Sequence, residues 1–465
     1  MKDETPSIRE MMFAQLVEKS LFEQAKSYAY EYVDQVRDRS VFPSDEVLDQ
    51  LAIFDEPVPQ TPQSGEEILD LLNTYGAPAT LPQTGGRYFG FVNGNAVPTA
   101  LAAKWLSDVW DQNGALHVMS PITAKLEEVC ERWATELLGL PSETAAGFVG
   151  GTSIATLCGL AAGRYALLKK AGWDVNADGL FNAPPIRVVI SQQAHSSVFK
   201  ALALLGFGKN QLEMVPADDQ GRIDPAQLPD LDSTTLLLLQ AGNVNTGAFD
   251  DFDQICTIAQ EAGAWVHIDG AFGLWAAASP HTKYLTQGLE KADSWSVDGH
   301  KTLNTPYDCA IVLCRDRSAL LGAMQATAAY IHYGEHRDSM LYTPDMSRRA
   351  RAIELWATLR FLGVTGLAEM IDNLCEGATQ FSEQLADHGF NILNDVVFNQ
   401  VLVACDTPEQ TQATLAAVQA SGECWCGGTS WQGDPAIRIS VCSWATTPED
   451  VERSVAAFVK ARASV

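Results

Sequence analysis

The residues with the clearest potential for chemistry lie around Lys301, in the run Asp298-Gly-His-Lys-Thr-Leu-Asn304. This run lies between the segments 295–297, in which apolar residues alternate, and 311–314, which is apolar. Lys301 is therefore expected between two strands. A solvated turn lysine is the alternative for this stretch alone. Only about one part in 2,500 of an ordinary lysine amine is neutral at pH 7. Deprotonating a lysine so that it can act as a nucleophile therefore costs free energy at this pH. Holding the amine as an imine with a carbonyl compound removes that cost.

Three further stretches carry groups that could serve such a lysine. Gly150-Gly-Thr-Ser153 follows an apolar run and precedes a helical pattern, the arrangement that binds anions at a helix N-terminus. Asp269 ends the apolar run 264–268, and the ends of parallel strands face the ligand edge of an α/β sheet. His195 directly precedes a predicted helix that begins at Ser196. Taken singly, each has a structural alternative: a tight turn, a capping carboxylate and a histidine satisfied within the fold.

In order and spacing, these four motifs together resemble the group II pyridoxal-phosphate-dependent decarboxylases, which include aromatic-amino-acid, glutamate and histidine decarboxylases. The resemblance extends from about Arg87 to Phe361. It implies that Lys301 forms an aldimine with pyridoxal 5'-phosphate, that Asp269 keeps the ring nitrogen protonated and that His195 stacks on the ring. It also implies cofactor contacts from a larger set: Gly151, Thr152, Ser153, His195, Asn243, Asp269, Ala271, His300 and Lys301.

The substrate side of the site depends on fewer residues. Arg438 stands where many enzymes of this type hold the substrate carboxylate, and an edge-strand arginine is its alternative. Phe91 is expected to line the substrate pocket, with a place in the apolar core as its alternative. The resemblance implies that Tyr330 protonates the carbon from which carbon dioxide leaves; a packed tyrosine is the alternative, and Tyr333 is a nearby competitor. Asn243 stands where the family commonly has a threonine, and its amide could donate to the ring hydroxyl.

The composition defines the broad class of the protein. Its 465 residues, 46% hydrophobic and 19% charged, fit a globular chain of two or three lobes. The 31 Lys and Arg against 58 Asp and Glu give a net charge of −27, which argues against nucleic acid and anionic membranes as partners. The chain has no apolar run of about 20 residues, and Met1-Lys-Asp-Glu lacks the pattern of a secretion signal. The 10 scattered cysteines favour reduced thiols, so we expect a cytoplasmic protein without a metal site.

The elements that must position these residues alternate between strands and helices from Arg87 onward. Short apolar runs of this kind are typical of buried parallel strands joined by helical crossovers. They lie at 145–149, 186–190, 235–239 and 264–268. The alternation predicts an α/β fold, and the resemblance implies pyridoxal-phosphate fold type I, the aspartate-aminotransferase type. That fold has a central, mostly parallel seven-stranded sheet with helices on both faces, plus a small α+β C-terminal domain.

We expect three segments along the chain: an N-terminal helical arm over 1–82, a large cofactor-binding α/β domain over 83–358 and a small domain over 359–465. Helical spacing predicts one long helix from about Glu10 to Arg37. Its apolar stripe consists of Phe13, Leu16, Val17, Leu21 and Tyr28. Because such a stripe must be covered, a homodimer is expected, and the resemblance implies an active site at its interface. The capping box Thr447-Pro-Glu-Asp450 predicts the start of the last helix.

The leading functional interpretation is decarboxylation of an L-amino acid to the amine, with an aromatic amino acid as one candidate substrate. An aminotransferase and a carbon–carbon lyase are the alternatives that keep the cofactor, because the same cofactor chemistry serves all three. A catalytically silent pyridoxal-phosphate-binding protein is a third alternative. The complete set of Lys301, Asp269 and His195 argues against it.

Overall fold

The computed structural model of the protein describes residues 6–324 and 336–465, and its main feature is a seven-stranded sheet. The strand order is β1-β7-β6-β5-β4-β2-β3, and β7 alone runs antiparallel to its neighbours β1 and β6. The strands are β1 (Ala145–Val149), β2 (Arg187–Ser191), β3 (Leu212–Val215), β4 (Thr235–Gln240), β5 (Trp265–Asp269), β6 (Ser294–Asp298) and β7 (Ala310–Cys314). The predicted, mostly parallel sheet is therefore confirmed.

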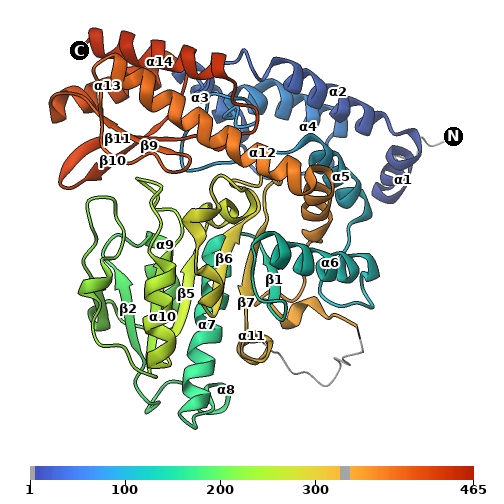
Figure 1. The fold of residues 1–465 in the computed structure, drawn as a ribbon. Helices are drawn as coiled ribbons and strands as arrows, with labels where there is room; N and C mark the ends of the chain where they lie inside the picture. Colours follow the sequence, from blue (N-terminus) through green and yellow to red (C-terminus); the bar gives the residue numbers. More distant parts are fainter. Residues whose placement is uncertain (1–5, 325–335) are drawn as a thin grey trace.

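Helices cover both faces of this sheet (Figure 1). One face packs against α7 (Thr152–Lys170), α9 (Ser196–Leu204) and α11 (Arg317–Met324). The other packs against α6 (Pro121–Leu137), α10 (Phe252–Ala262) and the first part of α12 (Ala352–Asp387). Every residue of β1, β4, β5, β6 and β7 is buried, because each strand is covered on both sides. Burial on both faces explains the continuous apolar runs of β1, β4 and β7. In contrast, β6 alternates Ser294, Ser296 and Asp298 with Trp295 and Val297, and both sets are buried.

A smaller antiparallel sheet lies in the C-terminal part of the chain, with the order β10-β11-β9-β8. Its elements are β8 (Asn391–Ile392), β9 (Gln400–Ala404), β10 (Gly427–Trp431) and β11 (Asp434–Ser440), with α13 (Pro408–Ser421) and α14 (Pro448–Ala463). The capping box at Thr447 starts α14 as predicted. The predicted domain boundary at 358–359 falls inside α12, which contacts both α6 and α14. The division into domains stays a prediction.

The N-terminal arm consists of α1 (Ile8–Glu18), α2 (Ser20–Gln35), α3 (Asp45–Gln50) and α4 (Gly65–Leu71). The prediction of one helix over 10–37 is wrong, because Lys19 adopts a left-handed backbone with φ 60° and ends α1. Its N–H still donates to the Gln15 carbonyl, so the first helix is capped while the chain changes direction. No residue of α1 is buried.

The segment 87–95 runs between the two sheets and leads to α5 (Pro98–Trp110). The Phe89 N–H donates to the Trp425 carbonyl at 2.7 Å, and the Asn95 N–H donates to Asn304 Oδ1 at 2.9 Å. A Cβ on Gly94 would lie 2.2 Å from the Lys301 carbonyl oxygen, so only glycine permits this approach. The segment therefore joins the small sheet to the backbone around Lys301. Within the described residues, no helix combines the length and apolar character needed to cross a bilayer.

Candidate active site

The structure brings most of the predicted site residues together in one pocket of about 370 Å³. The pocket lies at the carboxyl ends of β5 and β6, where parallel strands of an α/β sheet present their ligands. Of the predicted residues, it is lined by Phe91, Gly151, Thr152, Ser153, His195, Asp269, Ala271, His300, Lys301 and Arg438.

The N-terminus of α7 forms an anion cradle on one side of the pocket. Gly151 is the N-cap of this helix and provides no side chain to satisfy the free N–H groups. The Thr152 hydroxyl is buried and has no hydrogen-bond partner within residues 6–324 and 336–465. The helix pole and this free hydroxyl together fit a phosphate group.

Lys301 follows β6 by three residues and points into the same pocket. Its Nζ lies 3.1 Å from Asp298 Oδ2, and this carboxylate is almost completely buried. The Thr152 N–H donates to the other oxygen, Asp298 Oδ1, at 2.7 Å. Asp298 thus joins the lysine to the anion cradle, a link that sequence reasoning missed although Asp298 lies in the Lys301 motif.

Asp269, at the end of β5, and His195, at the N-terminus of α9, both line the pocket. Asp269 ends β5, and its Oδ1 accepts a hydrogen bond from the Ala271 N–H at 3.2 Å. Burial raises the pKa of Asp269, while His195 and Lys301 act in the opposite direction. His195 caps α9: its Nδ1 lies 2.7 Å from the Ser197 hydroxyl and accepts from the Ser197 N–H, which fixes the ring plane. Burial lowers the pKa of His195, against the effect of Asp269, and this favours the neutral ring.

His300 lies beside the cradle, and its ring stacks on Tyr307 with 4.3 Å between the ring centres. His300 Nδ1 accepts a hydrogen bond from the Cys309 N–H at 3.2 Å, so Nε2 carries the proton of the neutral ring. The Tyr307 hydroxyl donates to Asn93 Oδ1 at 3.2 Å. Tyr307 was not predicted as a site residue, because its position depends on a turn that packs against the segment 87–95.

Arg438 and Phe91 form the side of the pocket that faces the small sheet. Arg438 lies on β11, and its Nε is buried without a hydrogen-bond partner in the part of the chain that the structure describes. Burial lowers its pKa. Phe91 stacks on Trp425 with 5.5 Å between ring centres, and Phe91 and Val92 both have a left-handed backbone, with φ of 54° and 59°. Two such residues in succession are unusual and commonly occur at functional sites.

Asn243 does not belong to the pocket, so its prediction as a cofactor ligand is not supported. Its Oδ1 accepts hydrogen bonds from the backbone N–H groups of Asn245 and Thr246, which turns the amide toward Gly221. Its neighbour Val244 lines the pocket instead. The proposed proton donor Tyr330 lies outside the described residues, as does its competitor Tyr333.

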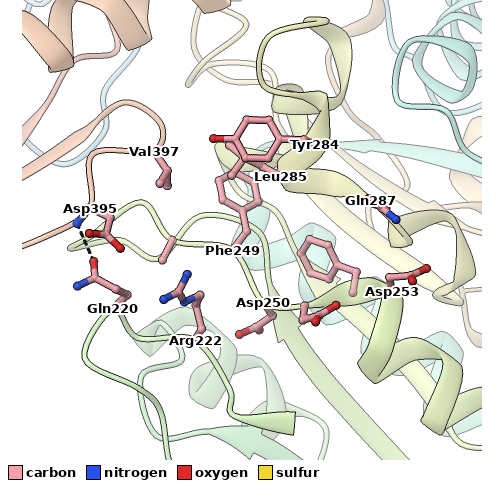
Figure 2. Close-up of a pocket in the computed structure, with 13 residues that line it drawn as sticks. Gln220, Arg222, Phe249, Asp250, Asp253, Tyr284, Leu285, Gln287, Asp395 and Val397 are labelled. Atoms are coloured by element: carbon pink, nitrogen blue, oxygen red, sulfur yellow. Dashed lines mark hydrogen bonds between the residues drawn. The ribbon is translucent and has the colours of Figure 1, made fainter.

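Figure 2 shows a second pocket, of about 400 Å³, where loops of the large sheet meet the segment around Asp395 and Val397. The Asp395 N–H donates to Gln220 Oε1 at 2.8 Å and ties the two parts together. Burial raises the pKa of Asp250 to about 7, and this carboxyl accepts hydrogen bonds from the N–H groups of Ile223 and Gln240. Gln240 also lines the candidate active site, so Asp250 helps to hold one wall of that site in place.

The donor set fits the cofactor that the resemblance implies. Pyridoxal phosphate requires an amine, an anion cradle, a carboxylate for the ring nitrogen and a flat group for the ring face. The pocket offers Lys301, the α7 N-terminus, Asp269 and His195 for these parts. Among the described residues, two buried polar atoms of this pocket have no hydrogen-bond partner, Thr152 Oγ1 and Arg438 Nε. They suit an anionic group of the cofactor and one of the substrate.

Comparisons with known proteins agree with this chemistry. The family model described as "Pyridoxal-dependent decarboxylase conserved domain" matches residues 49–404. Aromatic-L-amino-acid decarboxylase of Drosophila lebanonensis is 30% identical over 387 residues, which cover 78% of this chain and 95% of the relative. Tyrosine decarboxylase 2 of Narcissus pseudonarcissus is 24% identical over 470 residues, covering 94% of this chain and 93% of the relative.

Solved structures share the fold over nearly the whole chain. The structure of Oryza sativa TDC with PLP and tryptamine has a TM-score of 0.87 at 22% identity and covers 96% of this chain and 97% of that one. Catharanthus roseus tryptophan decarboxylase in complex with L-tryptophan has a TM-score of 0.85 at 21% identity, with coverage of 99% and 100%.

Proposed function

The chain belongs to the family of pyridoxal-dependent decarboxylases, and we propose that Lys301 is the residue through which this member binds its cofactor. The protein is a pyridoxal-phosphate-dependent amino-acid decarboxylase. One observation carries the assignment of Lys301: its amine shares a pocket with the α7 N-terminus, the Asp269 carboxylate and the His195 ring. When bound, the cofactor supplies the electron sink for the electron pair that departing carbon dioxide leaves behind.

Each side chain of the pocket then has a distinct task in this proposal. Gly151, Thr152 and Ser153, with His300 beside them, bind the phosphate through N–H and hydroxyl donors. Asp269 holds a proton on the ring nitrogen, because a carboxylate stabilises a cationic partner. The ring of His195, fixed by its cap contact with Ser197, would provide the flat group that packs on the cofactor ring. Ala271 is small, which lets the ring approach the end of β5.

An aromatic amino acid is the substrate class that we propose. The relatives named above act on aromatic amino acids according to their names. The apolar part of the pocket wall supports this choice, since it contains several rings and branched side chains. These are Phe91, Val92, Val244, Phe272 and Tyr307. A flat aromatic side chain of the substrate would bury the most apolar surface against such a wall.

A panel of amino acids tests this function. Carbon dioxide, amine, aldehyde and keto acid are measured together for aromatic, acidic and aliphatic substrates. Equal amounts of carbon dioxide and amine from an aromatic amino acid are expected. Keto acid without carbon dioxide would favour an aminotransferase, and aldehyde in place of amine would contradict the role of Tyr330 as the proton donor.

Arg438 is proposed to bind the substrate carboxylate, and its replacement separates substrate binding from cofactor binding. Arg438→Met should raise KM for the amino acid by about 10–100-fold, because the carboxylate loses a charged hydrogen-bond partner. Inhibition by the product amine, which has no carboxylate, should change little. Arg438→Lys, which keeps the charge, should lie in between. If Arg438→Met weakens the binding of the product amine as much as that of the amino acid, the arginine shapes the pocket and does not bind the carboxylate.

The proposed active form is a homodimer with the active site near the interface. Phe13 and Val17 are 62% and 77% exposed on α1, and Val109 on α5 is 75% exposed. Apolar surface of this kind on two helices supports an interface between copies of the chain. All 10 cysteines are free, which supports the proposed cytoplasmic location.

Charging the exposed face of α1 tests the proposed dimer. Phe13→Glu with Val17→Glu places two carboxylates on one face and should raise the dimer dissociation constant at least about tenfold. Analytical ultracentrifugation over a dilution series measures this constant. Phe13→Leu with Val17→Ile keeps the face apolar and should dimerise normally. A doubly charged variant that dimerises like the parent protein would exclude α1 from the interface.

A further inference from the structure

Asp298 places a fixed negative charge at the base of the anion cradle. It ends β6, is 2% exposed and is held by its backbone: its N–H donates to the Ala271 carbonyl, and its carbonyl accepts from Trp275 Nε1. Its two carboxylate oxygens contact different partners. Oδ1 accepts the first N–H of α7, from Thr152, at 2.7 Å, and Oδ2 lies 3.1 Å from Lys301 Nζ.

These contacts place Asp298 in competition with a bound phosphate. The N-terminus of α7 carries partial positive charge, and Asp298 already neutralises part of it through the Thr152 N–H. Asp298 also forms an ion pair with Lys301. His300 is a further titratable group near this carboxylate, and its Nε2 lies 3.5 Å from Oδ1. A phosphate group at this helix end would be repelled by the Asp298 carboxylate, because buried charges are only weakly screened from each other.

We propose that Asp298 is a positioning residue that limits how tightly the cradle holds the cofactor's phosphate group while it orients Lys301. Asparagine at this position would keep an oxygen acceptor for the Thr152 N–H and remove only the negative charge. Asp298→Asn should therefore strengthen the binding of the phosphate group. This inference rests on the proposed role of the α7 N-terminus as the phosphate cradle.

The experiment compares two ligands that differ only in the phosphate. Dissociation constants of pyridoxal phosphate and pyridoxal are measured by absorbance titration for the parent protein, Asp298→Asn and Asp298→Ser. The ratio of the pyridoxal constant to the pyridoxal phosphate constant reports the phosphate contribution alone. We expect this ratio to rise about tenfold in both variants. Asp298→Ser provides the test if Asp298→Asn does not fold.

Two controls separate this inference from its premise. Asp293→Asn removes a half-buried carboxylate just before the start of β6, where Asp293 Oδ2 accepts the Val266 N–H, and should leave the ratio unchanged. Thr152→Val removes a proposed phosphate ligand and should lower the ratio. If Thr152→Val does not lower it, the cradle assignment fails. If Thr152→Val lowers it and the Asp298 variants stay within twofold of the parent protein, the role of Asp298 is overturned.

Discussion

Lys301→Ala should abolish cofactor attachment and decarboxylation together. The lysine amine is the nucleophile of the proposed site, and alanine offers neither a bond to the cofactor nor a partner for Asp298. Turnover should fall at least about 10³-fold. Borohydride reduction followed by peptide mass spectrometry should find the cofactor on the Lys301 peptide of the parent protein and on no peptide of the variant.

Lys200→Ala is the matched control for this experiment. Lys200 is an exposed lysine on α9, the helix that His195 caps, so its loss tests a general effect of removing a lysine near the site. This variant should keep the label on Lys301 and normal turnover. Finding the label on another lysine of the parent protein would contradict the assignment of Lys301.

Asp269→Asn should retain the cofactor and lose most of the turnover. The amide keeps the size of the side chain but carries no charge, so it no longer holds the ring nitrogen protonated. We expect turnover to fall about 10²–10³-fold, which corresponds to roughly 3–4 kcal/mol of activation free energy. Cofactor occupancy, measured by absorbance after denaturation, shows whether the loss arises in catalysis or in binding.

Asp269→Glu complements the asparagine variant because it keeps the charge while moving the carboxylate. It should retain more activity than Asp269→Asn if the charge is the important property, and less if the position alone matters. Near-normal turnover of Asp269→Asn with full cofactor occupancy would exclude the proposed role.

The positions of strands, cradle and lysine were predictable because they depend on short-range patterns. The buried strands β1, β4 and β7 contain continuous apolar runs, a glycine pair before a helix leaves N–H groups free, and Thr447 with Asp450 forms a cap within four residues. The break at Lys19 was not predictable in this way. Its neighbours follow a helical pattern, and no glycine or proline indicates the left-handed turn that separates α1 from α2.

Local sequence was therefore sufficient for the α/β alternation, the family and the residues of the Lys301, Asp269 and His195 motifs. Contacts between distant segments decided the rest. Asn243 turns away from the pocket because its amide caps its own loop, and Asp298 gains its role only where β6 meets the N-terminus of α7, 146 residues away in sequence. Arg438 reaches the pocket because β11 of the small sheet lies against the segment 87–95. Such contacts depend on how separate elements pack, and no pattern within either segment encodes the distance between them.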